Sequence, residues 1–375
     1  MEAKTHIVDF SNSEIPFKLE SGESLSLLQV AYQSYGKLNS DGTNAIIVCH
    51  ALTGNAHAAG IQAKDETDAN SDPDLLKDYS KMFADKPGWW DALIGPDKLF
   101  DTNKYFVICS NFIGSCYGST GPVTIDPLTS KRYAKNFPFV SVRDMVHVQK
   151  KLIDYLGVKK IKTVSGGSLG GFQVFEWALM YPELVETIIP IATAVRHSPW
   201  AIGLNQTTRD AIRNDAKWQN GFYDDPPVDG LSLARKIAMI SYRSYDSFWQ
   251  KFARQQVKDK TNLYQIENYL DYQGTKLNKR FDANTYITIT EAMDHHDVTR
   301  DRGSIEEVLA KIDQPTLSIG ISSDVLYPPN EQKEFVELLP NAYYEEINSI
   351  HGHDAFLIEF DQIEQIVKPF IEKYF

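Results

Sequence analysis

Residues 161–178 read Ile-Lys-Thr-Val-Ser-Gly-Gly-Ser-Leu-Gly-Gly-Phe-Gln-Val-Phe-Glu-Trp-Ala. The segment begins with β-branched residues, which favour a strand, and ends with apolar residues at helical spacing. Between the two stands a Gly-x-Ser-x-Gly motif, with Gly166, Ser168 and Gly170 in the fixed places. Glycines there remove the Cβ atoms that would collide where a strand turns sharply into a helix. The pattern predicts an exposed Ser168 at the carboxyl end of a strand, beside a helix N-terminus; the alternative is an ordinary glycine-rich turn.

The composition indicates a globular protein with one large core and an elaboration, since 375 residues are 42% hydrophobic and 23% charged. The formal net charge of −12 argues against nucleic acid or an anionic membrane as the main partner. The three cysteines are an odd number without Cys-x-x-Cys spacing, which fits reduced thiols. The N-terminus lacks a signal segment, and no apolar run approaches the roughly 20 residues of a membrane span. We therefore expect a cytoplasmic protein.

Short apolar runs bounded by turn residues predict buried strands. They lie at residues 45–49, 105–109, 161–164, 187–192, 315–320 and 343–347. Amphipathic helices alternate with these strands. The helix at 142–156 has Ser141 and Asp144 as a capping pair and Gly157 as its stop, and another helix closes the chain at 363–374. This alternation predicts a parallel sheet with helices on both faces.

Other segments depart from the alternation. Apolar and polar residues alternate within 25–35, which predicts a half-buried antiparallel strand pair at a sheet edge, followed by a turn at 39–42. Residues 57–80 are polar, acidic and alanine-rich, and we expect a surface excursion there. Residues 111–122 form a glycine-rich loop, which we expect to be functional because such long loops inside compact domains usually have a role.

The buried-strand pattern lapses between about residues 195 and 302, which are rich in Gln, Asn, Asp, Arg and aromatic residues. Helical candidates lie at 198–214, 231–242, 247–256, 260–277 and 283–293. We predict that residues 195–302 form an inserted helical lid, and that residues 1–194 and 303–375 form the α/β core. An insertion of this size is large enough to cover the active edge of the sheet.

A nucleophilic serine needs a base that takes its proton and a carboxylate that orients the base. When the serine stands on a turn of this kind, the carboxylate and then the histidine follow it on loops after later strands. Asp324 comes just after the 315–320 strand, and His353 comes just after the 343–347 strand. We therefore predict that Ser168, Asp324 and His353 form a catalytic triad; a turn-forming role for Asp324 is the alternative.

Two histidines compete for the role of the base. His351 and His353 both follow the last predicted strand, and we favour His353 because Gly352 gives its backbone the freedom to turn inward. The two histidines, like the His-His-Asp run at 295–297, could suggest a metal. Neither group has a third ligand at helical or hairpin spacing, so we expect no metal.

An oxyanion hole in such an enzyme uses two backbone N–H groups. One would belong to Leu169, the residue after the predicted nucleophile, and the other to the loop after the 45–49 strand. Leu52 and Thr53 are the candidates there; we assign the oxyanion contact to Leu52 and a substrate contact to Thr53. These assignments rest on position, because backbone donors tolerate many side chains.

Several motifs accompany the triad in this sequence. They are His-Ala-Leu-Thr-Gly at 50–54, Pro-Gly-Trp-Trp-Asp at 87–91, Ile-Gly-Pro at 94–96, Tyr-Phe-Val-Ile-Cys-Ser-Asn at 105–111, Gly-Ser-Thr-Gly-Pro at 118–122, Gly-Gly-Ser-Leu-Gly-Gly at 166–171 and Gly-His-Asp-Ala-Phe-Leu at 352–357. In combination they closely resemble the homoserine O-acetyltransferase family of α/β-hydrolase-fold enzymes, from about residue 20 to the C-terminus. A generic hydrolase would share only the serine turn and the order of the triad.

The resemblance implies an α/β-hydrolase fold and acyl transfer from acetyl-CoA to the hydroxyl of L-homoserine, a step toward methionine. The implied route is ping-pong: Ser168 attacks the thioester, and the homoserine hydroxyl then attacks the acetyl-serine. His353 would take the proton in each half-reaction, with Asp324 behind it. No cofactor is implied beyond acetyl-CoA as co-substrate.

The resemblance also implies contacts with the acceptor and a homodimer formed through lid helices. In the family a lid-helix arginine holds the substrate carboxylate, and by motif this falls on Arg209. Arg213, one turn further on, is its rival, and a solvated lid arginine is the other interpretation. Asp354, directly after His353, would hold the substrate ammonium, with a helix N-cap as the alternative.

The sequence departs from the family pattern at a few positions. Leu169 and Phe172 stand where methionines are common, so succinyl-CoA as donor stays open, as does L-serine as acceptor. His351 stands where a non-titrating residue is usual. An esterase with the same triad is the second hypothesis, and a non-enzymatic binding protein, which the intact triad disfavours, is the third. Only the resemblance separates a transferase from a hydrolase here.

Overall fold

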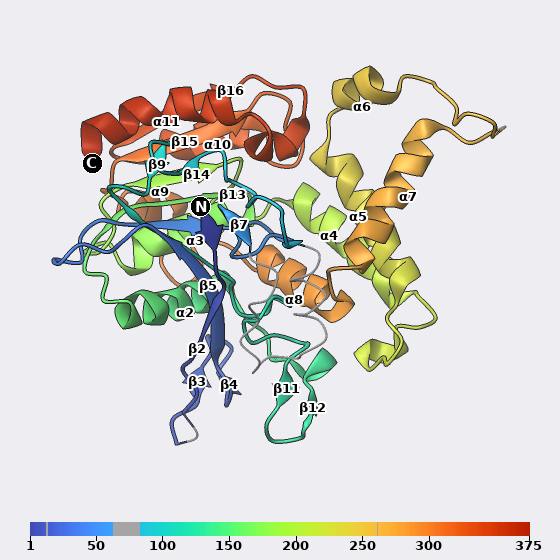
Figure 1. Cartoon of the computed structure of the whole chain (residues 1–375), viewed down its shortest axis with the longest axis horizontal. Coiled ribbons are helices and arrows are strands. Elements are labelled where there is room, and N and C mark those ends of the chain that lie inside the picture. Colours follow the sequence, from blue (N-terminus) through green and yellow to red (C-terminus); the bar gives the residue numbers. More distant parts are fainter. Residues whose placement is uncertain (13, 63–82, 261) are drawn as a thin grey trace.

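The computed structural model describes residues 1–12, 14–62, 83–260 and 262–375, and its centre is an eight-stranded sheet (Figure 1). In spatial order the strands are β16 (Ala342–Ile347), β15 (Thr316–Ile321), β14 (Ile188–Ile191), β13 (Ile161–Gly167), β6 (Ala45–Cys49), β10 (Phe106–Ser110), β5 (Gln29–Tyr35) and β2 (His6–Asp9). Neighbouring strands from β16 to β10 are parallel, whereas β5 runs antiparallel to β10 and β2. The predicted mostly parallel α/β sheet is confirmed.

Two apolar cores lie on opposite faces of this sheet, because successive strand side chains point to opposite sides. In β6, Ile47 belongs to the core that contains α2 (Val142–Tyr155) and α3 (Leu169–Met180). Its neighbour Ile46 belongs to the core that contains α11 (Phe360–Tyr374). Every residue of β6 is buried, which confirms the strand covered on both faces that its continuous apolar run predicted.

Helix α2 begins and ends where the sequence predicts. The Asp144 amide donates to Ser141 Oγ at 3.2 Å, and the Ser141 amide donates to Asp144 Oδ2 at 2.9 Å. The two contacts form a capping box that satisfies backbone N–H groups at the start of the helix. Gly157, at φ +82°, ends the helix in the left-handed conformation that glycine adopts without strain.

Shorter elements complete the fold around the main sheet. They are β1 (Glu2–Ala3) with β7 (Ile61–Gln62), β3 (Phe17–Lys18) with β4 (Ser24–Leu25), β8 (Ile94–Gly95) with β9 (Phe100–Asp101), β11 (Ile125–Asp126) with β12 (Lys131–Arg132), the 3₁₀ turns η1 (Ala134–Asn136), η2 (Gln219–Gly221) and η3 (Gly352–Leu357), and the helices α9 (Ile305–Leu309) and α10 (Pro329–Val336).

The strand pair predicted within residues 25–35 is wrong. Strand β5 is a single strand inside the sheet, and Leu25 belongs to the separate β3–β4 hairpin. Gln29 and Gln33, whose polarity suggested an exposed face, are buried. Gln33 Nε2 donates to Thr5 Oγ1 at 2.8 Å, so a tertiary partner satisfies the polar group that the sequence pattern assigned to water.

The start of the predicted surface excursion is also wrong. Residues 57–60 are buried, and the amides of Ala58 and Ala59 donate to Tyr35 Oη at 2.9 and 3.0 Å. Small side chains allow the backbone to approach this strand closely, so the alanines mark close packing and not exposure. The remainder of the predicted excursion, residues 63–80, lies outside the described residues.

Between β14 and β15 the described chain is helical, as the sequence predicts. This helical insertion contains α4 (Pro199–Arg213), α5 (Val228–Tyr242), α6 (Tyr245–Phe252), α7 (Gln265–Asn278) and α8 (Ala283–Asp294). Helix α5 packs against α4 and α7, and α4–α7 stand together on one side of the sheet (Figure 1). Helix α7 starts at Gln265 and not at residue 260, because Tyr264 and Glu267 form its N-terminal cap. Among the described helices, none has the length and apolarity needed to cross a bilayer.

Candidate active site

The predicted strand–turn–helix is present at Ser168, but the serine is buried and not exposed as the pattern predicts. Strand β13 ends at Gly167, α3 begins at Leu169, and Ser168 between them has φ 58° and ψ −125°. This strained conformation is held because the Ser168 amide donates to the Ile191 carbonyl of β14 at 3.0 Å. A Cβ atom built on Gly166 would lie 2.7 Å from the Cys49 carbonyl oxygen. The glycine is therefore required by the close approach of β6.

Asp324 and His353 meet beside the same edge of the sheet. Asp324 follows β15 and His353 follows β16, and His353 Nδ1 lies 2.7 Å from Asp324 Oδ2. The other carboxylate oxygen accepts hydrogen bonds from the backbone amides of Leu326 and Tyr327, at 2.8 and 3.0 Å. Because an ionised carboxylate only accepts, we assign the ring proton to Nδ1, which leaves Nε2 able to take a proton.

Opposing influences act on the pKa of His353, which is buried. Burial, the largest of them, lowers the pKa because it disfavours the charged ring. The charge of Asp324, the hydrogen bond with Asp324 and the charge of Asp354 raise it, and together they outweigh burial. The pKa of His353 is therefore raised above its ordinary value of 6.5. A raised pKa makes the ring a stronger base.

Phe356 ties the histidine loop to the serine turn. It lies in η3, three residues after His353, and a Cβ built on Gly167 would lie 2.6 Å from its ring. Trp90 Nε1 donates to the Phe356 carbonyl at 3.0 Å and fixes the turn from the other side. Among the described residues, neither Ser168 Oγ nor His353 Nε2 has a hydrogen-bond partner. Such catalytic contacts often tighten only when substrate is present.

The structure separates the two competing histidines. Only His353 contacts the Asp324 carboxylate; His351 is half-buried, and within the described chain its Nδ1 has no partner. Gly352 has φ +66°, and its amide donates to Ser323 Oγ at 2.9 Å. The chain thus reverses at the glycine, as expected, and this geometry favours His353 as the base.

The two backbone amides predicted to form an oxyanion hole lie just after the neighbouring strands β13 and β6. Leu169 is the first residue of α3, and Leu52 lies in the turn after β6, which the Gly54 amide closes onto the Ala51 carbonyl at 2.9 Å. Within the described ranges, neither the Leu52 nor the Leu169 amide has a hydrogen-bond acceptor. Both N–H groups are thus available to a ligand at the serine turn.

Arg280 holds the turn that contains Leu52 and Thr53, a contact that the sequence did not suggest. Its Nη1 donates to the Thr53 carbonyl and to Tyr117 Oη, each at 2.7 Å, and its Nη2 donates to Thr53 Oγ1 at 3.2 Å. Thr53 lies 227 residues before Arg280, so no local pattern could reveal the pair. Tyr117 comes from the glycine-rich loop at 111–122, which therefore reaches the site.

Arg209 is buried and already has an acidic partner. Its Nη2 donates to Asp294 Oδ2 at 2.6 Å, and the second carboxylate oxygen lies 3.0 Å from His197 Nδ1. Burial raises the pKa of Asp294, but hydrogen bonds from His197, Asn205 and Arg209 outweigh it and lower that pKa. His197 Nε2 lies 3.0 Å from Tyr327 Oη, so this network ends beside the Asp324 loop.

Arg235 shows the opposite situation on α5. Its guanidinium carbon lies 5.6 Å from the ring centre of Tyr242, which lies 5.8 Å from the ring of His353. The described cations of residues 199–243 other than Arg235 pair with carboxylates; they are Arg209, Arg213, Lys217, Lys236 and Arg243. Arg235 forms no ion pair with any described residue. Sequence reasoning missed it because a missing partner is a tertiary property.

Arg213 and Asp354 complete the set of predicted substrate contacts. Arg213 is exposed and donates to Glu291 Oε1 at 2.7 Å, so it too has an acidic partner. Asp354 follows His353, and its Oδ2 lies 3.2 Å from Arg243 Nε. Burial dominates the raised pKa of Tyr242, and the charges of Arg235 and Asp354 also act on this phenol. Arg235 lies over the Tyr242 ring, and Asp354 is the residue next to His353.

His295 and His296 pack against aromatic rings. His296 stacks on Phe172 with ring centres 4.2 Å apart, and its burial and nearby cations lower its pKa. His295 meets Phe139 edge-on at 5.0 Å. In the part of the chain that the structure describes, no three potential ligands gather to hold a metal ion.

The sheet, the serine turn and the acid–histidine pair define a protein of the alpha/beta hydrolase fold, whose family model matches residues 44–359. Curated relatives show which family within this fold the chain belongs to. The chain is 47% identical over 366 residues to homoserine O-acetyltransferase of Nostoc punctiforme, covering 96% of this chain and 94% of that protein. It is 45% identical to the Carboxydothermus hydrogenoformans enzyme of the same name, covering 99% and 97%. The chain belongs to the homoserine O-acetyltransferase family, a family of acyltransferases.

Solved structures show the same architecture with two kinds of named activity. Homoserine O-acetyltransferase from Bacillus anthracis matches with a TM-score of 0.87 and 28% identity, over 99% of this chain and 98% of that chain. Esterase E22 matches with a TM-score of 0.85 and 26% identity, over 98% and 100%. The scaffold is therefore shared by acyltransferases and ester hydrolases, and the site must separate them.

Proposed function

We propose that this protein transfers the acetyl group of acetyl-CoA to the hydroxyl of L-homoserine, a step of methionine biosynthesis. The observation that carries the proposal is the arrangement around His353. The ring pairs with Asp324, Asp354 is the next residue in the chain, and Tyr242, 5.8 Å from the ring, has Arg235 over its own ring at 5.6 Å. A cation and an anion beside the base suit the carboxylate and ammonium of an amino acid, which a simple ester lacks.

In the first half-reaction Ser168 Oγ attacks the thioester carbonyl while His353 Nε2 takes its proton. The amides of Leu169 and Leu52 stabilise the oxyanion of the tetrahedral intermediate. When the carbon–sulfur bond breaks, the imidazolium returns its proton to the departing thiolate and CoA leaves. In the second half the homoserine hydroxyl gives its proton to His353 and attacks the acetyl-serine. Collapse of that intermediate releases O-acetylhomoserine and regenerates Ser168.

We assign the carboxylate contact to Arg235 in preference to Arg209. A buried arginine whose charge is already balanced gains little from a second carboxylate, and Asp294 lies 2.6 Å from Arg209. Arg235 has no carboxylate partner among the described residues, so a substrate carboxylate would supply one. Asp354 keeps the proposed ammonium contact, with its Arg243 pair holding the side chain in place.

An esterase function is the second candidate, favoured by the likeness to esterase E22. In that case water would deacylate Ser168 and the charges at Arg235 and Asp354 would have no role. Succinyl-CoA and L-serine remain the alternative donor and acceptor. The buried Phe172 and Leu169 beside Ser168 shape the acyl site and bear on the choice of donor.

The decisive experiment measures CoA release from acetyl-CoA and, separately, from succinyl-CoA, with and without L-homoserine or L-serine. Mass spectrometry of the protein follows the acyl adduct in parallel. Homoserine-dependent release from acetyl-CoA, with an adduct on Ser168, is the expected result. Release that is independent of any acceptor would favour the hydrolase.

We further propose that the helical insertion, residues 195–302, acts as a lid on the core and that the protein is a homodimer in the cytoplasm. Large aromatic residues are exposed on the insertion: Trp200, Phe222, Tyr245, Trp249 and Tyr272. Exposed aromatic side chains on neighbouring helices support a contact between subunits. The three free cysteines support a reducing compartment.

A further inference from the structure

A group of cations lies where the helical insertion approaches the oxyanion turn. Lys276 is in the last turn of α7, Arg280 lies just beyond that helix, and Lys86 comes from the core before β8. The pKa of Lys276 is lowered by partial burial and then by the charges of Arg280, Lys86 and Arg235, in that order. Lys276 stands four residues before Arg280, so the two lie at the same end of α7, and Arg280 contacts Thr53 while the Lys86 carbonyl contacts His57, four residues further along the same loop. The charges that act on Lys276 agree with this placement.

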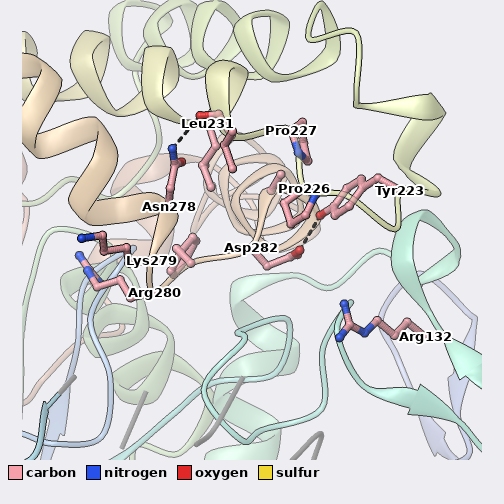
Figure 2. A pocket seen from close by; sticks show the side chains of 12 residues that line it. Arg132, Tyr223, Pro226, Pro227, Leu231, Asn278, Lys279, Arg280 and Asp282 are labelled. Atoms are coloured by element: carbon pink, nitrogen blue, oxygen red, sulfur yellow. Dashed lines mark hydrogen bonds between the residues drawn. The ribbon is translucent and has the colours of Figure 1, made fainter. Parts of the chain in front are cut away.

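Arg280 fixes the position of this group relative to the chemistry. Its hydrogen bonds to the Thr53 carbonyl and Tyr117 Oη place its guanidinium on the turn that presents the Leu52 amide. In Figure 2 the side chains of Lys279 and Arg280 extend in the same direction, away from Asp282. The Lys86 carbonyl, which accepts from His57 Nε2 at 3.0 Å, fixes the core side of the group.

The charge of this group is not balanced by the protein. Among the described residues, Lys86, Lys276 and Arg280 form no ion pair with a carboxylate, although the chain as a whole has a net charge of −12. The hydrogen-bond acceptors of the Arg280 guanidinium are neutral. Gathering unpaired cations costs free energy through mutual repulsion, which an anionic ligand would remove.

We propose that Lys86, Lys276 and Arg280, a set called here the phosphate cluster, bind the phosphate groups of the CoA thioester. This proposal rests on the proposed function. In this proposal the pantetheine arm of a thioester bound at Ser168 would pass the turn that contains Thr53, which Arg280 contacts, and the pyrophosphate and 3′-phosphate would lie beyond it. Lysine ammoniums and an arginine fork suit phosphate oxygens, and Arg235, nearer His353, remains for the acceptor carboxylate.

The test compares two acetyl donors. Acetyl-CoA carries all the phosphates, whereas S-acetylpantetheine carries the same reactive end without them. We expect Lys276→Gln and Lys86→Gln each to raise the KM for acetyl-CoA about tenfold, since one charged contact is lost. Their kcat and their KM for S-acetylpantetheine should stay at the wild-type values. Lys258→Gln, which removes an exposed lysine between α6 and α7, is the matched control and should change neither.

Two results would overturn the phosphate cluster: an unchanged KM for acetyl-CoA in the Lys86→Gln/Lys276→Gln double variant, or equal increases for both donors. Calorimetric titration of CoA into the wild type and the double variant gives a readout independent of turnover. We expect the Kd to rise at least tenfold, and an unchanged Kd rejects the cluster. Failure of the proposed function looks different, because wild-type protein would then release CoA from neither donor in response to homoserine.

Discussion

The carboxyl edge of the sheet and Arg235 of the helical insertion differ in how their polar groups are held. At the edge, other groups of the described chain hold the side chains in place. Ser168 has a positive φ, and the Asp324 carboxylate accepts hydrogen bonds from two backbone amides and from the His353 ring. In the insertion, Arg235 has no carboxylate partner in the described chain. The comparison teaches that the groups proposed for the chemistry are held by other protein groups, whereas the cation proposed for substrate recognition has no carboxylate partner among the described residues.

The largest effect on activity is expected when the predicted nucleophile at the carboxyl edge of the sheet is removed. Ser168→Ala should lower kcat by about 10⁴-fold or more, because the enzyme loses the Oγ atom that forms the acyl intermediate. The acyl adduct should vanish from the mass spectrum while circular dichroism stays unchanged. A retained burst of CoA release would show that another residue is the nucleophile.

Asp324→Asn tests whether the edge works through His353. An amide can bind the wrong ring tautomer, so we expect kcat to fall about 10³- to 10⁴-fold. In the wild type, kcat/KM should fall as the pH drops through the raised pKa of His353, because the protonated ring cannot act as a base. Since Asp324 raises that pKa, the acid limb of the pH profile should move to lower pH in Asp324→Asn. An unmoved limb would exclude His353 as the titrating group.

Arg235 and Arg209, two arginines of the insertion, allow the most direct test of this comparison. Arg235→Met should raise the KM for L-homoserine about 100-fold with little change in stability, since no carboxylate among the described residues loses a partner. Arg209→Met should instead lower the free energy of unfolding by about 3 kcal/mol, because the largely buried Asp294 loses its arginine and keeps only the hydrogen bonds from His197 and Asn205. Steady-state kinetics and urea unfolding of both variants distinguish the roles. The reverse pattern would restore Arg209 as the carboxylate contact.

A smaller effect is expected at the neighbouring histidine. His351→Asn should change kcat less than about threefold, because this ring has no contact with Asp324 and, among the described residues, its Nδ1 has no partner. His353→Ala, measured in the same assay, provides the scale. Equal losses in the two variants would overturn the choice of His353 as the base.

A substitution on the exposed face of the insertion should affect the chemistry least, because it is expected to change the contact between subunits. Trp249, exposed on α6 and stacked on Tyr245, should lie in the subunit contact. A buried glutamate there is unfavourable, so Trp249→Glu should shift the protein from dimer to monomer in sedimentation experiments. Glu372→Gln, at the far end of the chain, serves as the control. A wild-type monomer would reject the homodimer.

Features that depend on neighbouring residues could be predicted from the sequence, whereas contacts between distant segments could not. The serine turn, the capping box of α2 and the places of Asp324 and His353 after their strands could be predicted because each depends on adjacent residues. Arg280 and Thr53 could not be paired, because their contact joins segments 227 residues apart. Burial of Gln33 was missed for the same reason, since Thr5 satisfies its amide only in the folded chain. The triad assignments, the oxyanion donors and the substrate contacts stay predictions until tested.

The crowding at the serine turn bears on how such proteins diversify. A methyl group at Gly166 or Gly170 would run into the Cys49 carbonyl, so single substitutions cannot adjust this junction without displacing β6. Evolution therefore has little freedom in the nucleophile itself. If Arg235 and Lys276 make the contacts proposed for them, new substrates can be acquired through the insertion, where replacing either residue changes a charge and leaves the strands untouched. A scaffold with a fixed reactive centre and an adaptable cover can give rise to transferases and esterases alike.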